Sequence, residues 1–147
     1  MKKTSRPAVS HFVLAALVLA GLVDLAGFAF GLFYGGIFYD NLAHLVTSFA
    51  LVALAAELYA HYGARVGGQE LLFMGRRAIV AGAILGLCGG IVWEAFEAVL
   101  DHFYPETIYS PPVDSVVDTL FGTIGGAAGA WRTANHLHGV SLRRLLG

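Results

Sequence analysis

The sequence predicts an all-α integral membrane protein, a four-helix bundle with both termini in the cytoplasm. Its 147 residues are 57% hydrophobic and only 13% charged, and the mean hydropathy is +0.70. Soluble domains usually carry about 25% charged residues. One cysteine excludes an internal disulfide framework and a cysteine-rich zinc module. Composition therefore favours a small membrane domain.

Four apolar segments are each close to the roughly 20 helical residues that cross a hydrocarbon core of about 30 Å. Because the segments are continuous rather than alternating, they favour helices over membrane strands. We expect a single transmembrane domain over residues 1–147, with helices at 9–33, 38–59, 78–100 and 113–131 and a short basic cytoplasmic tail at 133–147.

The first segment follows Met1-Lys2-Lys3, as a signal peptide would. It is longer than the 7–15-residue core of a signal peptide and lacks a small-x-small cleavage site, so we interpret it as a retained helix. The second segment opens with Asp40 and the third ends with Trp93-Glu94-Ala95-Phe96-Glu97. Pro111 and Pro112 suit the start of the fourth helix. Glycines at four-residue spacing predict close contacts between helices.

The basic residues predict the orientation of the chain. All nine lie before the first helix, between the second and third, or after the fourth: Lys2, Lys3, Arg6, Arg65, Arg76, Arg77, Arg132, Arg143 and Arg144. The two other connections contain neither Lys nor Arg. The positive-inside rule therefore predicts a multi-pass membrane protein with both termini and the middle connection in the cytoplasm.

The acids gather at the opposite side. In this topology the second helix starts, the third ends and the fourth starts at the periplasmic face. Helical spacing of three or four residues places the members of three pairs on common faces: Asp40 with His44, Glu94 with Glu97, and Asp114 with Asp118. Asp24 lies slightly deeper, and His102 lies close to the acidic layer. Sequence alone assigns no role to Asp24 or to His102.

The acidic layer has no basic partner within reach, because every Lys and Arg is assigned to the other face. Either the carboxyls are partly protonated, since burial and like charges favour the neutral form, or they hold a cation. Placement in interfacial water is a third interpretation, and Asp40 and Asp114 can each cap a helix. We favour a divalent metal ion, for which carboxylates and one imidazole are suitable ligands. The predicted ligands are Asp40, His44, Glu94, Glu97, Asp114 and Asp118.

Three motifs carry a resemblance to known families: Tyr39-Asp40-Asn41-Leu42-Ala43-His44, Trp93-Glu94-Ala95-Phe96-Glu97, and Asp114-Ser115-Val116-Val117-Asp118 with Gly122. They resemble the YjdF-like family of uncharacterised bacterial inner-membrane proteins. Their order is also similar to the wider VanZ-like group, linked to glycopeptide-antibiotic tolerance. Asp118 stands where VanZ-like proteins usually have Asn, and the Arg-x-x-Ser/Asp run of that group is missing. The resemblance implies an architecture and a polar site and leaves the reaction open.

Three functions remain open at this point. One is a metalloprotein that acts on a lipid or lipid-linked substrate at the periplasmic face, with one carboxylate as general base. A second is proton or cation permeation, and a third is a structural or accessory membrane subunit. We expect membrane lipids as partners and no nucleic acid, because the basic residues form no nucleic-acid-binding face. The catalytic residues, the metal and any homo-oligomer are left open.

Overall fold

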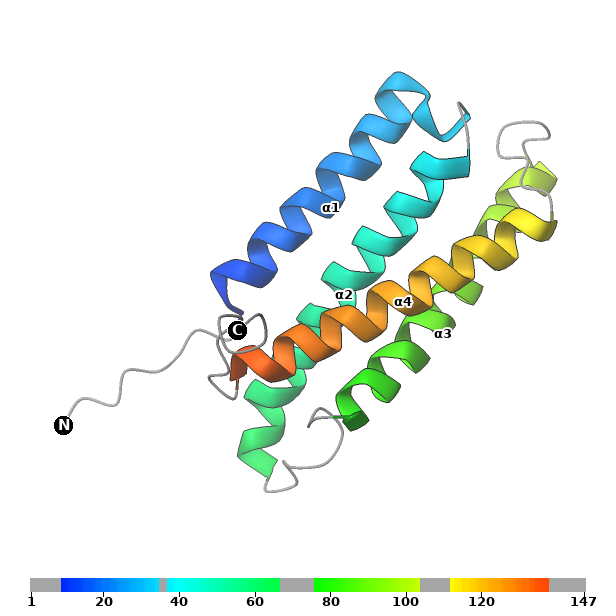
Figure 1. The fold of residues 1–147 in the computed structure, drawn as a ribbon. Helices are drawn as coiled ribbons and strands as arrows, with labels where there is room; N and C mark the ends of the chain where they lie inside the picture. Colours follow the sequence, from blue (N-terminus) through cyan, green and yellow to red (C-terminus); the bar gives the residue numbers. More distant parts are fainter. Residues whose placement is uncertain (1–8, 35–36, 67–75, 104–111, 138–147) are drawn as a thin grey trace, which may run out of the picture.

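The computed structural model describes residues 9–34, 37–66, 76–103 and 112–137. These residues form four α-helices and one 3-10 turn, without a β-strand (Figure 1). The helices are α1 (His11–Phe30), α2 (Ile37–Val66), α3 (Arg76–Phe103) and α4 (Pro112–Leu137), and the turn η1 (Leu32–Tyr34) follows α1. The predicted all-α fold is confirmed.

The helix ends differ from those of the predicted segments. The helices α2, α3 and α4 each enclose a predicted segment and extend past both of its ends, whereas α1 is shorter than the first segment. Because α4 continues through Leu137, residues 133–137 of the predicted tail are helical. The remaining tail, 138–147, lies outside the described residues.

Local sequence explains both ends of α1. Ser10 has extended backbone angles and its Oγ accepts a hydrogen bond from the Val13 N–H at 3.3 Å, as an N-cap residue does. At the other end Gly31 adopts the left-handed conformation, with φ of 64°, and its N–H donates to the Gly27 carbonyl. A side chain is unfavourable at that φ, so glycine suits the position at which α1 stops.

The central helix of the fold is α4, which packs against both α2 and α3 (Figure 1). The contact between α2 and α3 themselves is much smaller. The first helix, α1, packs on α2 and η1, and none of its Cα atoms lies within 8 Å of α3 or α4. The four helices thus follow the spatial order α1, α2, α4, α3, with α1 at the edge.

Glycines bring α4 close to both neighbours. A Cβ on Gly82 or Gly86 of α3 would collide with the carbonyl of Gly126 or Gly122 of α4. On the other side of α4, a Cβ on Gly125 would collide with the Leu45 carbonyl of α2. These contacts are backbone against backbone, as the four-residue glycine spacing predicts.

Three of the described helices are long and apolar enough to cross a membrane: α1, α2 over Phe38–Tyr62, and α3. The sequence predicts four such spans, and α4 is not among those that length and composition identify. The physical reason for this difference is the composition of α4, which carries Asp114, Asp118 and Arg132 among many Gly, Thr and Ala residues. Packing between two apolar helices lets this least apolar helix contribute its polar groups to the interior.

Candidate functional site

Antiparallel packing brings the predicted acidic pairs together at one end of the molecule. The first turns of α2 and α4 and the last turns of α3 lie at that end (Figure 1). Asp40 and His44 of α2 and Asp118 of α4 each offer one ligand atom, and these three atoms lie within 4.8 Å of one another. We call Asp40, His44 and Asp118 the DHD cluster.

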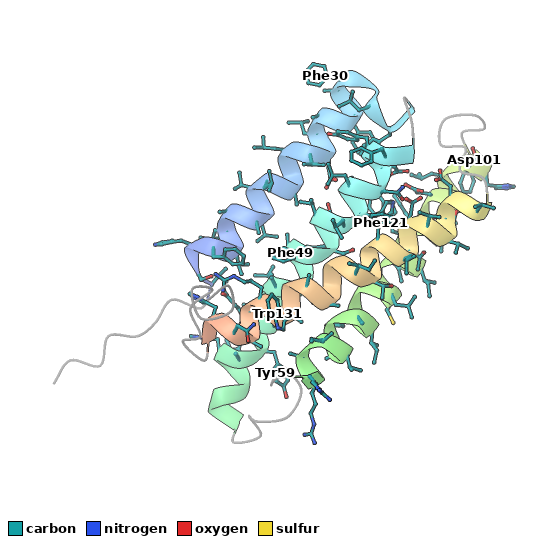
Figure 2. The ribbon with its side chains drawn as sticks, in the orientation of Figure 1. Phe30, Phe49, Tyr59, Asp101, Phe121 and Trp131 are labelled. Atoms are coloured by element: carbon teal, nitrogen blue, oxygen red, sulfur yellow. The ribbon has the colours of Figure 1, made fainter. Side chains whose placement is uncertain are left out.

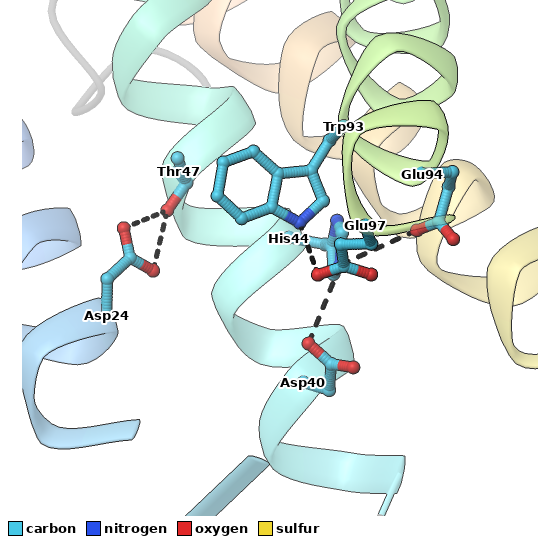
Figure 3. A network of polar contacts seen from close by, with 7 residues as sticks. All are labelled: Asp24, Asp40, His44, Thr47, Trp93, Glu94 and Glu97. Atoms are coloured by element: carbon cyan, nitrogen blue, oxygen red, sulfur yellow. Dashed lines mark hydrogen bonds and ion pairs between the residues drawn. The ribbon is translucent and has the colours of Figure 1, made fainter. Parts of the chain in front are cut away.

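His44 lies at the centre of the acids. Its Nε2 atom is 3.5 Å from Asp40 Oδ1 and 3.9 Å from Glu94 Oε1 of α3 (Figure 3). Both separations are too long for a good hydrogen bond, for which about 2.7–3.2 Å is typical. The side chains of His44, Asp40 and Glu94 are 8%, 19% and 14% exposed. The imidazole therefore faces two largely buried carboxylates without hydrogen bonding to either.

Several buried oxygens around His44 have no hydrogen-bond partner. They include Oδ1 of Asp118, a residue only 1% exposed, and Oε1 of Glu94. Oδ1 of Asp114 is in the same situation, and Asp114 interacts electrostatically with Asp40 and Asp118. Buried polar atoms are normally paired, because an unpaired one costs about 1–3 kcal/mol. The cluster is thus rich in acceptors and poor in donors.

Glu97 is held differently from the other predicted ligands. Its Oε1 accepts a hydrogen bond of 2.7 Å from Trp93 Nε1, one turn earlier on α3 (Figure 3). Glu97 interacts electrostatically with Glu94, Asp40 and Asp114, so it belongs to the same acidic region. The DHD cluster does not include Glu97, Glu94 or Asp114. Of the six predicted ligands, the structure places three within a common ligand distance and three beside them.

Asp24 and His102, which the sequence left without a role, lie outside the DHD cluster. Both carboxylate oxygens of Asp24 are 3.2 Å from the Thr47 hydroxyl, which donates to them (Figure 3). Thr47 stands on α2 one turn beyond His44. The carboxylate of Asp24 on α1 therefore lies close to the cluster and already has a hydrogen-bond donor. His102 is exposed at the end of α3 and its ring contacts Phe103.

Basic side chains stand far from these acids in the described part of the chain. Arg76 and Arg77 begin α3, and Arg132 is near the end of α4. Along the helix axes they are about 20 Å or more from Glu94 and Asp118. The sequence argument that Lys and Arg cannot neutralise the acidic layer therefore applies to the described residues of the fold.

A further buried carboxylate, Glu57 of α2, was missed by the sequence analysis. Its two oxygens accept hydrogen bonds of 2.6 Å from the N–H and the hydroxyl of Ser10. Glu57 is 5% exposed, and the contact fixes the start of α1 on α2. The signals were a serine just before an apolar segment, where an N-cap is expected, and an acid inside the segment 38–59. Neither signal alone reveals that the two residues meet.

Comparison with known proteins gives a family and no function. Residues 2–138 match the family model described as "Predicted membrane protein (DUF2238)", and the chain belongs to this family. The YjdF-like resemblance is consistent with that family, and the VanZ-like similarity stays a prediction. No curated protein and no solved structure matches the chain.

Proposed function

We propose that this multi-pass membrane protein binds a divalent metal ion in the DHD cluster and uses the site on a lipid or lipid-linked substrate at the outer face of the inner membrane. The observation that carries the proposal is the meeting of Asp40, His44 and Asp118 from two helices, with their ligand atoms within 4.8 Å of one another. In this arrangement both termini are cytoplasmic, following the distribution of the bases.

The geometry fits a small divalent ion. Metal–ligand distances of about 2.0–2.2 Å bring ligand atoms to about 4.4 Å of one another at most. The three ligand atoms of the cluster lie within 4.8 Å of one another, so small side-chain movements would let them bind one ion. The unpartnered Oδ1 of the buried Asp118 is an acceptor that a cation would satisfy. Carboxylates with one imidazole suit Zn²⁺, Mn²⁺ and Fe²⁺, and Glu94 is placed to add a fourth ligand.

A metal in this position would supply Lewis-acid chemistry. Glu97 would be the proton acceptor of the site, because the Trp93 indole binds one of its oxygens and holds the carboxylate beside the cluster. Trp93 is 45% exposed, so this side of the site faces the surroundings of the protein. A membrane-embedded lipid head group could approach there.

Permeation is less well supported than metal binding. On the cytoplasmic side of the cluster, α3 and α4 are in direct backbone contact through Gly86 with Gly122 and Gly82 with Gly126. Backbone contact of this kind leaves no room for a row of waters or ions between the two helices. The Asp24–Thr47 pair joins α1 to α2 and lies apart from the contact between α3 and α4.

Metal content tests the proposal directly. The full chain, purified in detergent and reloaded with Zn²⁺, Mn²⁺ or Fe²⁺, should retain about one ion per chain in elemental analysis. His44→Ala and Asp118→Asn should each lower the affinity at least tenfold. Asp24→Asn is the matched control, because its carboxylate already accepts from Thr47. Wild-type protein without stoichiometric metal, or variants that retain it, would contradict the proposal.

Substrate turnover is tested separately from metal binding. The protein in lipid nanodiscs is incubated with a bacterial lipid extract, and metal-dependent changes in lipid composition are followed by mass spectrometry. Glu97→Gln should abolish the change while it retains the metal. An unchanged lipid composition with fully loaded wild-type protein would remove the enzymatic part of the proposal and leave the metal site intact.

A further inference from the structure

An apolar groove lies between α1 and α4, with Phe49 of α2 among its walls (Figure 2). It has a volume of about 430 Å³ and is lined by α1, α2 and α4, with Phe12, Ala16, Leu19, Leu45, Phe49 and Ala128 among its walls. We call it the lateral groove. Its volume lies in the range of about 300–1,000 Å³ that ligand pockets usually have.

The lateral groove exists because α1 and α4 both pack on α2, while no Cα atom of α1 lies within 8 Å of one of α4. Small residues widen it, since Ala15 and Ala16 of α1 face Gly125 and Ala128 of α4 across α2. The floor is supplied by Leu45, Val46 and Phe49 of α2. The walls are almost entirely apolar, so a ligand inside the groove must itself be apolar.

A cation stands at one end of the lateral groove. Gly125, Ala128 and Arg132 are spaced by three and four residues and share one face of α4. The guanidinium Cζ of Arg132 lies 4.6 Å from the centroid of the Phe12 ring, which lines the groove. In the described residues Arg132 forms no ion pair, and the carboxylate of Glu57 accepts from Ser10 with both oxygens.

We propose that the lateral groove binds an acyl chain of an anionic phospholipid whose phosphate contacts Arg132. The apolar walls fit the acyl chain, and the guanidinium at the groove's end complements the negative phosphate, for which it is a preferred partner. Two candidate membrane-spanning helices, α1 and α2, form most of the walls, so the occupant comes from the bilayer.

The dimensions favour a chain over a helix from a second copy. A helix with its side chains is about 10 Å across and rises about 5.4 Å per turn, so one turn occupies roughly 420 Å³. The lateral groove would accommodate only that one turn. An extended acyl chain is much thinner and can follow the groove along its length toward Arg132.

Bound lipid can be measured on the intact chain. The protein is extracted into detergent containing equal amounts of phosphatidylglycerol and phosphatidylcholine with identical acyl chains, and native mass spectrometry counts the lipids retained. We expect one retained phosphatidylglycerol in preference to phosphatidylcholine. Arg132→Gln should lower that preference about fivefold, the effect of one basic residue near anionic lipid. Arg132→Lys, which keeps the charge, should retain most of it.

Filling the groove separates the acyl contact from the charge. Ala16→Phe should release both lipids, whereas Ala55→Phe, on the exposed side of α2, should not. Equal retention of the two lipids by wild-type protein would overturn the proposal. So would a lipid signal that Ala16→Phe and Arg132→Gln both leave unchanged, or a dimer that Ala16→Phe dissociates. If Ala16→Phe does not fold, the comparison of Arg132→Gln with Arg132→Lys tests the proposal by itself. The result is independent of the metal site.

Discussion

Ser10 has two partners that connect a local signal to the tertiary structure. Its hydroxyl caps α1 by accepting from Val13, and it also donates to the buried carboxylate of Glu57. Hydrogen bonds to charged groups contribute about 1.5–3 kcal/mol, more than neutral ones. A single side chain thereby starts a helix and fixes it to its neighbour.

Replacing Ser10 by alanine should therefore cost more than the loss of an N-cap. We expect the free energy of unfolding to fall by about 2–3 kcal/mol, since the cap contributes about 1 kcal/mol and the carboxylate loses its hydroxyl donor. Equilibrium unfolding in mixed detergent micelles measures the change. Ser10→Thr keeps the hydroxyl and should stay within about 1 kcal/mol of wild type. A loss below about 0.5 kcal/mol in Ser10→Ala would show that the Glu57 contact contributes nothing.

The indole of Trp93 offers a test at the same scale. Trp93→Phe removes the only donor that the described residues provide to Glu97 and keeps an aromatic ring at the position. With the carboxylate no longer oriented, we expect metal content to be unchanged and the turnover proposed above to fall at least tenfold. Elemental analysis and the lipid assay on one preparation give both values. Loss of metal from Trp93→Phe would instead assign Glu97 to the metal ligands.

Single residues also show what sequence reasoning can and cannot reach. Helical spacing places Asp40 with His44 on one face, and the charge distribution places that face in the same layer as Asp118. Which acids share a ligand distance depends on helix rotation, which spacing within one helix does not determine. Glu97 illustrates this, because its partner turned out to be Trp93, one turn away on its own helix.

At the scale of elements, the contact between α3 and α4 depends on glycines of each helix that face the backbone of the other. Gly86→Ala places a Cβ against the Gly122 carbonyl, which cannot move independently of α4. We expect a loss of about 1–3 kcal/mol in the free energy of unfolding, the usual cost of overpacking. The matched control is Gly89→Ala on the same helix, where a Cβ meets open space. Higher helix propensity should leave that variant as stable as wild type or slightly more stable.

The composition of α4 explains why the sequence predicts a fourth membrane span there. An apolar segment of about 20 residues indicates a membrane helix. Segment 113–131 has about that length, but its many Gly, Ala and Thr residues give it a low hydropathy. Their low hydropathy instead reflects two protein-facing sides, one toward α3 and one toward α2. Between those two sides α4 keeps one exposed apolar face with Val116, Leu120 and Ile124, so only part of the helix is available for contact with lipid.

For the whole molecule, the order α1, α2, α4, α3 could not be derived from the sequence. Short connections predict that neighbours in sequence lie side by side, yet α2 packs far more on α4 than on α3, the helix that follows it. The all-α class and the gathering of acids at one end follow from hydropathy and charge, which do not depend on that order. The lateral groove does depend on it, because α1 and α4 must both pack on α2 with their backbones kept apart.

The orientation of the whole chain is a prediction that labelling can test. In a Cys88→Ser background, a cysteine at Thr107 should react with a membrane-impermeant maleimide added to intact cells. A cysteine at Gln69, in the connection that the positive-inside rule assigns to the cytoplasm, should react only after the cells are opened. Labelling of Gln69→Cys in intact cells would reverse the orientation and place the acidic layer at the cytoplasmic face.

The central place of α4 has a consequence for synthesis. Because α4 leaves the ribosome after α2 and α3, those two helices must enter the bilayer with little contact between them. Until α4 arrives, His44 and Glu94 lack the helix that encloses them, and the DHD cluster lacks Asp118. A chain released before residue 112 would expose these polar groups to lipid, a feature that membrane quality-control proteases can recognise. The site is therefore complete only after α4 has entered the bilayer.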